Sequence, residues 1–260
     1  MESNRRDFLK IGSLCALGVS ALPVAKAVAT NDSPFQAGRG ALTGKQWAMV
    51  IDMKKCWEKA KPGCKDCMVA CHTTHNVPEI PDAEEQVKWL WTESYEGTFP
   101  GTEHHYMPEK LHDKPFLVTC NHCTKPACVR VCPTQATWKR SEDGIVMMDF
   151  HRCIGCRYCM AACPFGARSF NFREPREHVK TELNMQFPTR ERGVVEKCNF
   201  CYERLAAGQL PACVESCKVG ALAFGDVEDP KSPVRKLLNE NRTIQRRPEL
   251  GTQPNIFYII

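Results

Sequence analysis

The sequence predicts an α+β fold of short strands and short helices joined by long loops, and three observations predict it. Short apolar runs, such as residues 47–52 and 145–149, have the length of strands rather than of helices. Sixteen of the 17 cysteines fall into four groups of four along the chain. The pattern of strand, cysteine group and following strand repeats. We therefore expect small, similar units rather than one large sheet or helical bundle.

Length, charge and hydropathy exclude several classes of protein. The 260 residues leave room for one to two domains. Thirty-five basic and 30 acidic residues give a net charge of +5, too weak to indicate a nucleic-acid partner. No apolar run reaches the ~18 residues that a membrane-spanning helix needs, so we expect no membrane span.

Residues 1–29 have the composition of an export signal. Arg5 and Arg6 precede an apolar stretch over residues 11–22, and small-residue cleavage sites end at Ala27 and Ala29. The arginine pair is typical of the twin-arginine route, which we expect to deliver the chain, folded around its cofactor, to the periplasm. Cys15 then leaves with the signal. The alternative is an amphipathic N-terminal helix.

The remaining sixteen cysteines have the spacing of iron–sulfur ligands. The third group reads C-x2-C-x2-C-x3-C-P, the spacing of bacterial ferredoxins, in which three thiolates bind one [4Fe–4S] cluster and the fourth binds its neighbour. The second group is a close variant, C-x2-C-x4-C-x3-C-P. A disulfide scaffold and zinc sites are the alternatives, but the first would close only very small loops and the second favours paired C-x2-C motifs. The four groups are Cys56, Cys64, Cys67, Cys71; Cys120, Cys123, Cys128, Cys132; Cys153, Cys156, Cys159, Cys163; and Cys198, Cys201, Cys213, Cys217.

Each predicted strand lies beside one of these groups. Asp143-Gly144 is a favourable hairpin turn between two of the strands. The segments Cys132–Ala136, Cys163–Ala167 and Cys217–Ala221 match in spacing, and a short strand follows each. The predicted strands are residues 47–52, 116–119, 137–140, 145–149, 169–172, 193–196 and 222–225.

Two ferredoxin-like units follow from an exchange of fourth ligands between neighbouring groups. The contiguous unit spans residues 115–172, and the discontinuous unit combines residues 47–75 with 193–226. We expect four [4Fe–4S] clusters, held by Cys120/Cys123/Cys128/Cys163, Cys153/Cys156/Cys159/Cys132, Cys56/Cys64/Cys67/Cys217 and Cys198/Cys201/Cys213/Cys71. The wide step from Cys56 to Cys64 leaves open a [3Fe–4S] cluster at that site.

The segments between these units are predicted to cover the clusters or to dock partners. They are a linker over residues 30–46, insertions over 76–114 and 173–192, and a docking tail over 227–260. The apolar final pentapeptide, residues 256–260, favours burial of its side chains.

Electron transfer is the predicted role, without a catalytic residue of its own. The chain has no G-x-S-x-G and no phosphate-binding loop, and sixteen cysteines for four clusters leave no open iron. A stand-alone iron–sulfur enzyme remains the alternative. We expect the eight histidines to be surface or interface residues, and basic residues beside the cysteines, such as Lys125, Arg130, Arg157 and Lys218, to be surface charges that can also raise cluster potentials.

The cysteine pattern over residues 47–226 resembles the four-cluster electron-transfer subunits of dimethyl sulfoxide, polysulfide and formate-dependent nitrite reductase systems, and the similarity extends to residues 250–254. Within this family, residues 71–78, 87–91 and 151–172 are most similar to the DsrO branch, the periplasmic iron–sulfur subunits of the DsrMKJOP complex. The resemblance implies a peripheral subunit on the outer face of the cytoplasmic membrane. It implies as partners an NrfD-like integral membrane subunit that reacts with quinone, a multihaem cytochrome c, and other Dsr subunits. The alternative within the family is the small subunit of a molybdenum-containing reductase acting on polysulfide, tetrathionate or a similar substrate.

Overall fold

A computed structural model describes residues 38, 40–102, 106, 108, 111 and 113–260. The predicted export signal at 1–29 and residues 30–37 and 39 of the predicted linker lie outside the described residues, as do parts of the 76–114 insertion. The chain from residue 37 onward forms one unit by its internal contacts, and the fold below is that of this unit.

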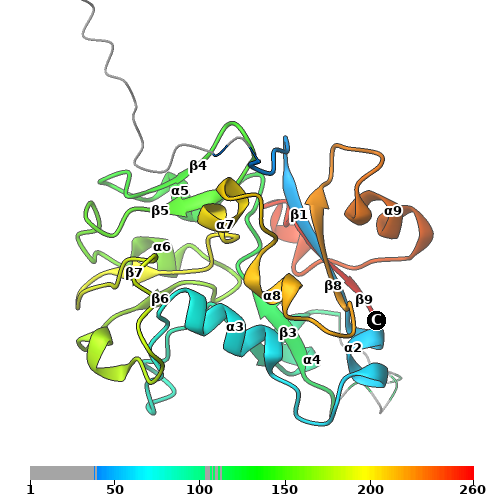
Figure 1. Cartoon of the computed structure of the whole chain (residues 1–260), viewed down its shortest axis with the longest axis horizontal. Coiled ribbons are helices and arrows are strands. Elements are labelled where there is room, and N and C mark those ends of the chain that lie inside the picture. The colour runs from blue at the N-terminus through cyan, green and yellow to red at the C-terminus, as the bar shows by residue number, and fades with distance from the viewer. Residues whose placement is uncertain (1–37, 39, 103–105, 107, 109–110, 112) are drawn as a thin grey trace, which may run out of the picture. The chain divides into compact units, whose positions relative to one another are not determined.

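The largest sheet has three strands, with β1 (Trp47–Asp52) in the centre (Figure 1). Strand β1 is antiparallel to β8 (Leu222–Asp226) on one side and parallel to β9 (Ile256–Ile259) on the other. Its alternate residues face two layers. Met49 and Ile51 belong to the main core, whereas Ala48 and Val50 pack with helix α9 (Pro233–Glu240) on the other face. Coverage of both faces explains why β1 is almost continuously apolar.

Three further sheets are antiparallel pairs of very short strands. The pairs are β2 (Leu90–Glu93) with β3 (Phe116–Thr119), β4 (Thr137–Lys139) with β5 (Val146–Met148), and β6 (Ser169–Phe170) with β7 (Val195–Glu196). The hairpin of β4 and β5 turns at Asp143-Gly144, as predicted, with Gly144 at a φ of +76° that suits glycine.

Most described helices are one or two turns long, and several of them carry cysteines of the four groups. Besides α9, they are α2 (Met53–Lys59), α3 (Asp66–Thr74), α4 (Tyr95–Thr98), α5 (Ala127–Arg130), α6 (Tyr158–Ala161), α7 (Tyr202–Ala206) and α8 (Ala212–Glu215), with 3₁₀ turns η2 (Pro175–His178) and η3 (Pro248–Leu250). Helix α3 packs against α8, and α5 packs against α6, so residues from different cysteine groups lie side by side.

A buried ion pair fixes the 173–192 insertion to the rest of the unit. Arg190 contacts Glu196 at 2.5 Å, and both side chains are fully buried. Arg190 also donates to the backbone carbonyls of His75 and Asn76, and Trp89 donates to Glu196 at 2.7 Å. Each charge therefore has a charged partner and further hydrogen bonds, as a buried ion pair requires.

The pairing of strands crosses the predicted boundaries between units. Strands β1 and β8 join the two distant pieces of the discontinuous unit, as that prediction requires. However, β6 of the contiguous unit pairs with β7 of the other, and β3 pairs with β2 from the 76–114 insertion. The division into two ferredoxin-like units therefore stays a prediction. Strand β9 is part of the central sheet, so only the more exposed residues of the 227–260 tail are available for docking.

Candidate metal centres

All sixteen cysteines outside the predicted export signal are free thiols. They gather in space into four sets, because each thiol whose pKa is shifted is shifted in part by other thiols close to it. Each set combines cysteines from more than one part of the chain.

The first group contains Cys56, Cys64, Cys67 and Cys217. Burial, followed by the nearby thiols of Cys217, Cys56 and Cys64, raises the pKa of Cys67 to about 12. Burial and the thiols of Cys217 and Cys64 likewise raise the pKa of Cys56. Helix α2 positions Cys56, and Asp52 caps that helix by accepting from the Lys55 backbone N–H at 2.8 Å. The wide spacing before Cys64 thus does not separate Cys56 from the group.

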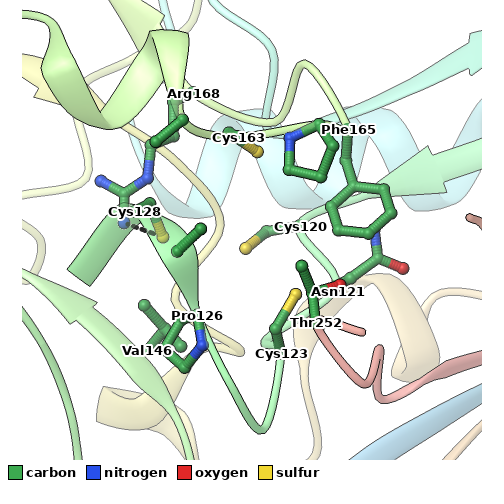
Figure 2. Close-up of a pocket in the computed structure, with 13 residues that line it drawn as sticks. Cys120, Asn121, Cys123, Pro126, Cys128, Val146, Cys163, Phe165, Arg168 and Thr252 are labelled. Atoms are coloured by element: carbon green, nitrogen blue, oxygen red, sulfur yellow. Dashed lines mark hydrogen bonds between the residues drawn. The ribbon is translucent and has the colours of Figure 1, made fainter. Parts of the chain in front are cut away.

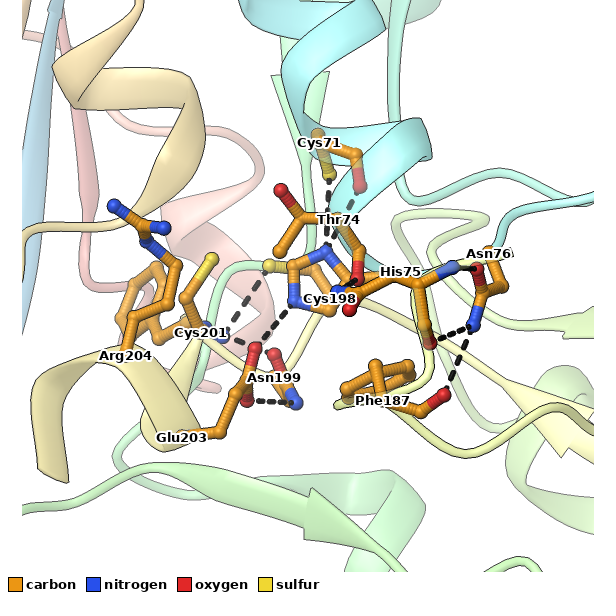
Figure 3. Close-up of polar contacts among 12 residues, drawn as sticks. Cys71, Thr74, His75, Asn76, Phe187, Cys198, Asn199, Cys201, Glu203 and Arg204 are labelled. Atoms are coloured by element: carbon orange, nitrogen blue, oxygen red, sulfur yellow. Dashed lines mark hydrogen bonds and ion pairs between the residues drawn. The ribbon is translucent and has the colours of Figure 1, made fainter. Parts of the chain in front are cut away.

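The second group contains Cys71, Cys198, Cys201 and Cys213. Complete burial raises the pKa of Cys71 well above its usual value, and the thiols of Cys198, Cys213 and Cys201 raise it further. Figure 3 shows His75 beside this group, between Cys71 and Glu203. His75 Nε2 lies 2.8 Å from Glu203 Oε1, and its ring stacks on Trp89 with centroids 4.6 Å apart.

The third group contains Cys120, Cys123, Cys128 and Cys163, which line one pocket with Asn121 (Figure 2). Burial, with the thiol of Cys120 as the next cause, raises the pKa of Cys123 to about 12. Asn121 is buried, and neither its amide nitrogen nor its amide oxygen has a hydrogen-bond partner. A buried amide without a partner is costly, which favours a ligand in this pocket.

The fourth group contains Cys153, Cys156, Cys159 and Cys132. Burial raises the pKa of Cys159, an effect opposed by Arg168 and supported by the thiols of Cys128 and Cys153. Partial burial also acts to raise the pKa of Cys132, but hydrogen bonds from Thr137, Thr134 and the backbone outweigh it and lower the value. Cys132 follows helix α5, which packs against the helix α6 that carries Cys159.

Contacts between groups place them in a linear order. Cys67 acts on Cys71, so the first group adjoins the second. Cys120 acts on Cys198, which joins the second group to the third. Cys128 acts on Cys159, which joins the third group to the fourth. The thiols therefore form a single file of four groups through the unit.

The donor set fits iron–sulfur clusters. Thiols with raised pKa values are protonated at neutral pH unless a metal displaces the proton. Arg168 and Lys197 are buried beside these thiols, and no carboxylate of the described residues forms an ion pair with either. Thiolates bound to a metal would supply the missing negative charge. Cys71, Cys120 and Cys213 also belong to the main apolar core, so the groups are shielded from water.

Sequence reasoning missed several buried polar residues. His75 and His122 are 1% and 0% exposed, so the expectation of surface histidines is wrong for these two. The buried cations beside the thiols are Arg168 and Lys197, not the four basic residues named from the sequence. Arg168 follows the repeated Ala of the third group, where the other repeats place Thr137 and Leu222 at the start of buried strands. A charge at that repeat position is the signal that could have revealed it.

Comparisons with known proteins agree with this arrangement. Residues 114–227 match the 4Fe-4S dicluster domain, which covers three of the four cysteine groups along the chain. The described residues contain no helix long and apolar enough to cross a membrane.

The chain is also similar over its full length to three known proteins. It is 38% identical to the Hdr-like menaquinol oxidoreductase iron-sulfur subunit 1 of Archaeoglobus fulgidus, over 98% of this chain and 97% of that protein. It is 35% identical to a subunit of tetrathionate reductase from Salmonella typhimurium, over 100% and 89%. It is 32% identical to the protein NrfC of Escherichia coli, over 100% and 96%. The protein therefore belongs to the family of 4Fe-4S dicluster iron–sulfur subunits that includes these three proteins.

Proposed function

We propose that this chain is an electron-transfer subunit that holds four [4Fe–4S] clusters, one at each thiol group. The single file of four groups is the observation that carries the proposal, because electrons cross a protein between cofactors that lie in sequence. A [4Fe–4S] cluster supplies one-electron storage, at a potential that its ligands, charges and hydrogen bonds set.

The residues of the chain would bind and insulate these clusters. Cys56, Cys64, Cys67 and Cys217 would hold the first, and Cys71, Cys198, Cys201 and Cys213 the second. The third would be held by Cys120, Cys123, Cys128 and Cys163, and the fourth by Cys132, Cys153, Cys156 and Cys159. The proximity of Cys56 to Cys64 and Cys217 favours a complete set of four ligands, and so a [4Fe–4S] rather than a [3Fe–4S] cluster at the first site.

The first and fourth groups stand at the two ends of the file. Cys64 of the first group is exposed, and Ile154 beside Cys153 in the fourth group is 67% exposed. An electron donor and an electron acceptor would therefore meet opposite ends of the file. The two inner groups would exchange electrons only with their neighbours in the file.

We propose as partners an NrfD-like membrane subunit that reacts with quinone and a multihaem cytochrome c. The likeness to an iron–sulfur subunit of a menaquinol oxidoreductase supports the first. The twin-arginine motif at residues 5–10 supports a periplasmic position on the outer face of the cytoplasmic membrane. Within the family, we propose the DsrO branch and a role in sulfur or sulfite metabolism.

A second candidate is the small subunit of a molybdenum-containing reductase. The likeness to a tetrathionate reductase subunit over the whole chain favours it. The two candidates share the clusters and differ in the partner that exchanges electrons with them.

Anaerobic purification with iron and sulfide analysis tests the cluster count. We expect about sixteen irons and about sixteen sulfides for each chain, because four cubanes hold four of each. About eight irons would contradict four clusters, and an iron-free active preparation would contradict electron transfer by clusters altogether. Replacing Cys56 by alanine should change one electron paramagnetic resonance (EPR) signal; unchanged signals would exclude Cys56 as a ligand.

Identification of co-purifying chains separates the two candidates. A multihaem cytochrome c and a polytopic membrane subunit are expected for the first. A molybdopterin-containing subunit in their place would support the second and overturn the first.

A further inference from the structure

Two buried cations lie between neighbouring thiol groups. Arg168 is 4% exposed and Lys197 is 1% exposed. By comparison, the buried Arg190 has the carboxylate of Glu196 at 2.5 Å. The positive charges of Arg168 and Lys197 therefore face thiols instead of carboxylates, which is an unusual place for a buried cation.

Arg168 connects the third and fourth groups. Its Nη2 donates to Cys128 Sγ at 3.1 Å and to Thr137 Oγ1 at 2.8 Å (Figure 2 shows the contact with Cys128). Its Nη1 lies 3.7 Å from Met148 Sδ. The guanidinium also hydrogen-bonds the thiol of Cys159 and lowers its pKa against the effect of burial. One rigid fork thus spans a thiol from each group.

Lys197 connects the second and third groups. Its Nζ donates to the carbonyl oxygen of Cys198 at 2.6 Å and to that of Val146. Complete burial lowers the pKa of Lys197, while the thiols of Cys120 and Cys198 act to raise it. The third group therefore has both cations beside it, and each of its neighbours has one.

The second group has the opposite charge nearby. Glu203 lies beside Cys201 and acts, after burial and the thiol of Cys213, to raise the pKa of Cys201 further. Glu203 also accepts from Asn199 at 3.0 Å and contacts His75. The two inner groups are both shielded from water, so they differ mainly in the sign of the charge that adjoins them.

We propose that Arg168 and Lys197 hold the reduction potential of the cluster at Cys120, Cys123, Cys128 and Cys163 above that of the cluster at Cys71, Cys198, Cys201 and Cys213. This inference rests on the proposed function. Reduction adds one electron and so one negative charge to a cluster. A nearby cation in a region of low dielectric stabilises the reduced form more than the oxidised form, and a nearby carboxylate does the reverse. An electron that enters the file then resides preferentially on the third group.

Redox titration of the anaerobically purified protein, followed by EPR, tests this inference. Arg168→Gln removes the charge but keeps a polar side chain, whereas Arg168→Lys keeps the charge. In Arg168→Gln we expect the equilibrium constant for reduction at the third group to fall about tenfold or more, and about 59 mV corresponds to each tenfold for a one-electron couple. We expect Arg168→Lys to keep most of the wild-type potential, and the first group to be unaffected in both variants.

Lys218→Gln is the matched control. Lys218 follows the ligand Cys217, but its side chain is 87% exposed and faces Asp66. Water and salt screen such a charge, so this variant should leave every potential unchanged. A shift as large as that of Arg168→Gln would show that burial of the cation is irrelevant and would overturn the inference.

A second measurement does not depend on the folding of Arg168→Gln. In otherwise wild-type protein, Cys123→Ser should alter the signal of the third group and Cys213→Ser that of the second. The signal altered by Cys123→Ser should have the higher wild-type potential; the reverse order would overturn the inference. Unchanged potentials in an iron-replete Arg168→Gln protein would overturn it too. A wild-type preparation without cluster signals would instead contradict the proposed function, so the two failures are distinguishable.

Discussion

Individual residues in left-handed backbone conformations allow the chain to turn tightly around its cysteines. Gly155, between Cys153 and Cys156, has a φ of +68°, and Gly166, after Cys163, has a φ of +63°. The surroundings of the two glycines differ. A Cβ atom on Gly155 would lie 2.4 Å from the carbonyl oxygen of Gly193, whereas one on Gly166 would meet nothing within 4 Å.

The first prediction compares alanine at these two glycines. Gly166→Ala should cost about 1–2 kcal/mol, the strain of a left-handed alanine, and retain the full iron content. Gly155→Ala should cost more, because the backbone of Gly193 cannot move aside as a flexible side chain could. We expect this variant to lose the cluster of Cys132, Cys153, Cys156 and Cys159. Iron analysis should then show about four irons fewer per chain, by the composition of one cubane. Equal iron content in the two variants would contradict the prediction.

At the scale of elements, strand β9 completes the central sheet although it lies at the end of the sequence. Ile256 and Tyr258 are fully buried, and the Tyr258 ring packs edge-on against Phe99 with centroids 5.2 Å apart. The backbone of Tyr258 exchanges two hydrogen bonds with Ile244. The Tyr258 hydroxyl has no hydrogen-bond partner among the described residues, and burial raises the pKa of this tyrosine. Its ring therefore stabilises the fold, and its hydroxyl does not.

The second prediction separates these two parts of Tyr258. Tyr258→Ala should lower the free energy of unfolding by about 3–5 kcal/mol, because it opens a cavity under the central sheet. Tyr258→Phe should leave it unchanged or raise it by up to about 1 kcal/mol, because it removes a buried hydroxyl without a partner. Urea unfolding of the iron-loaded protein, followed by tryptophan fluorescence, measures both. A large loss in Tyr258→Phe would mean that the hydroxyl has a partner after all.

At the scale of the whole molecule, metal binding and folding depend on the same residues. Several ligand thiols are part of the main core, and the buried charges of Arg168 and Lys197 lie beside them. Without a metal, the core would contain clustered protonated thiols and two cations without negative partners. Both conditions destabilise a folded state.

The third prediction concerns removal of iron. Treatment with ferricyanide and a chelator should abolish the near-ultraviolet circular dichroism of the tryptophans in step with the loss of iron, because binding energy is part of folding energy. The chelator alone is the control and should leave both signals unchanged. A protein that keeps its near-ultraviolet signal after losing all iron would have a core that does not need the metal.

Much of the local structure follows from the sequence. The strands at 47–52 and 116–119 have the predicted bounds, and the hairpin turn at Asp143-Gly144 is confirmed. The other predicted strands exist but differ by one or two residues at their ends, for example β6, which stops at Phe170. Strands β2 and β9 are absent from the sequence prediction, because their pairing depends on partners far away in the chain.

The sequence by itself determined the chemistry of this protein, because the spacing of cysteines around a cluster is local and can be counted along the chain. Only the tertiary structure decided the order of the four thiol groups and the placement of Arg168, Lys197 and Glu203 beside them. Those neighbours lie far apart in sequence, and the field at a buried site depends on distance and burial in space, which no local pattern records.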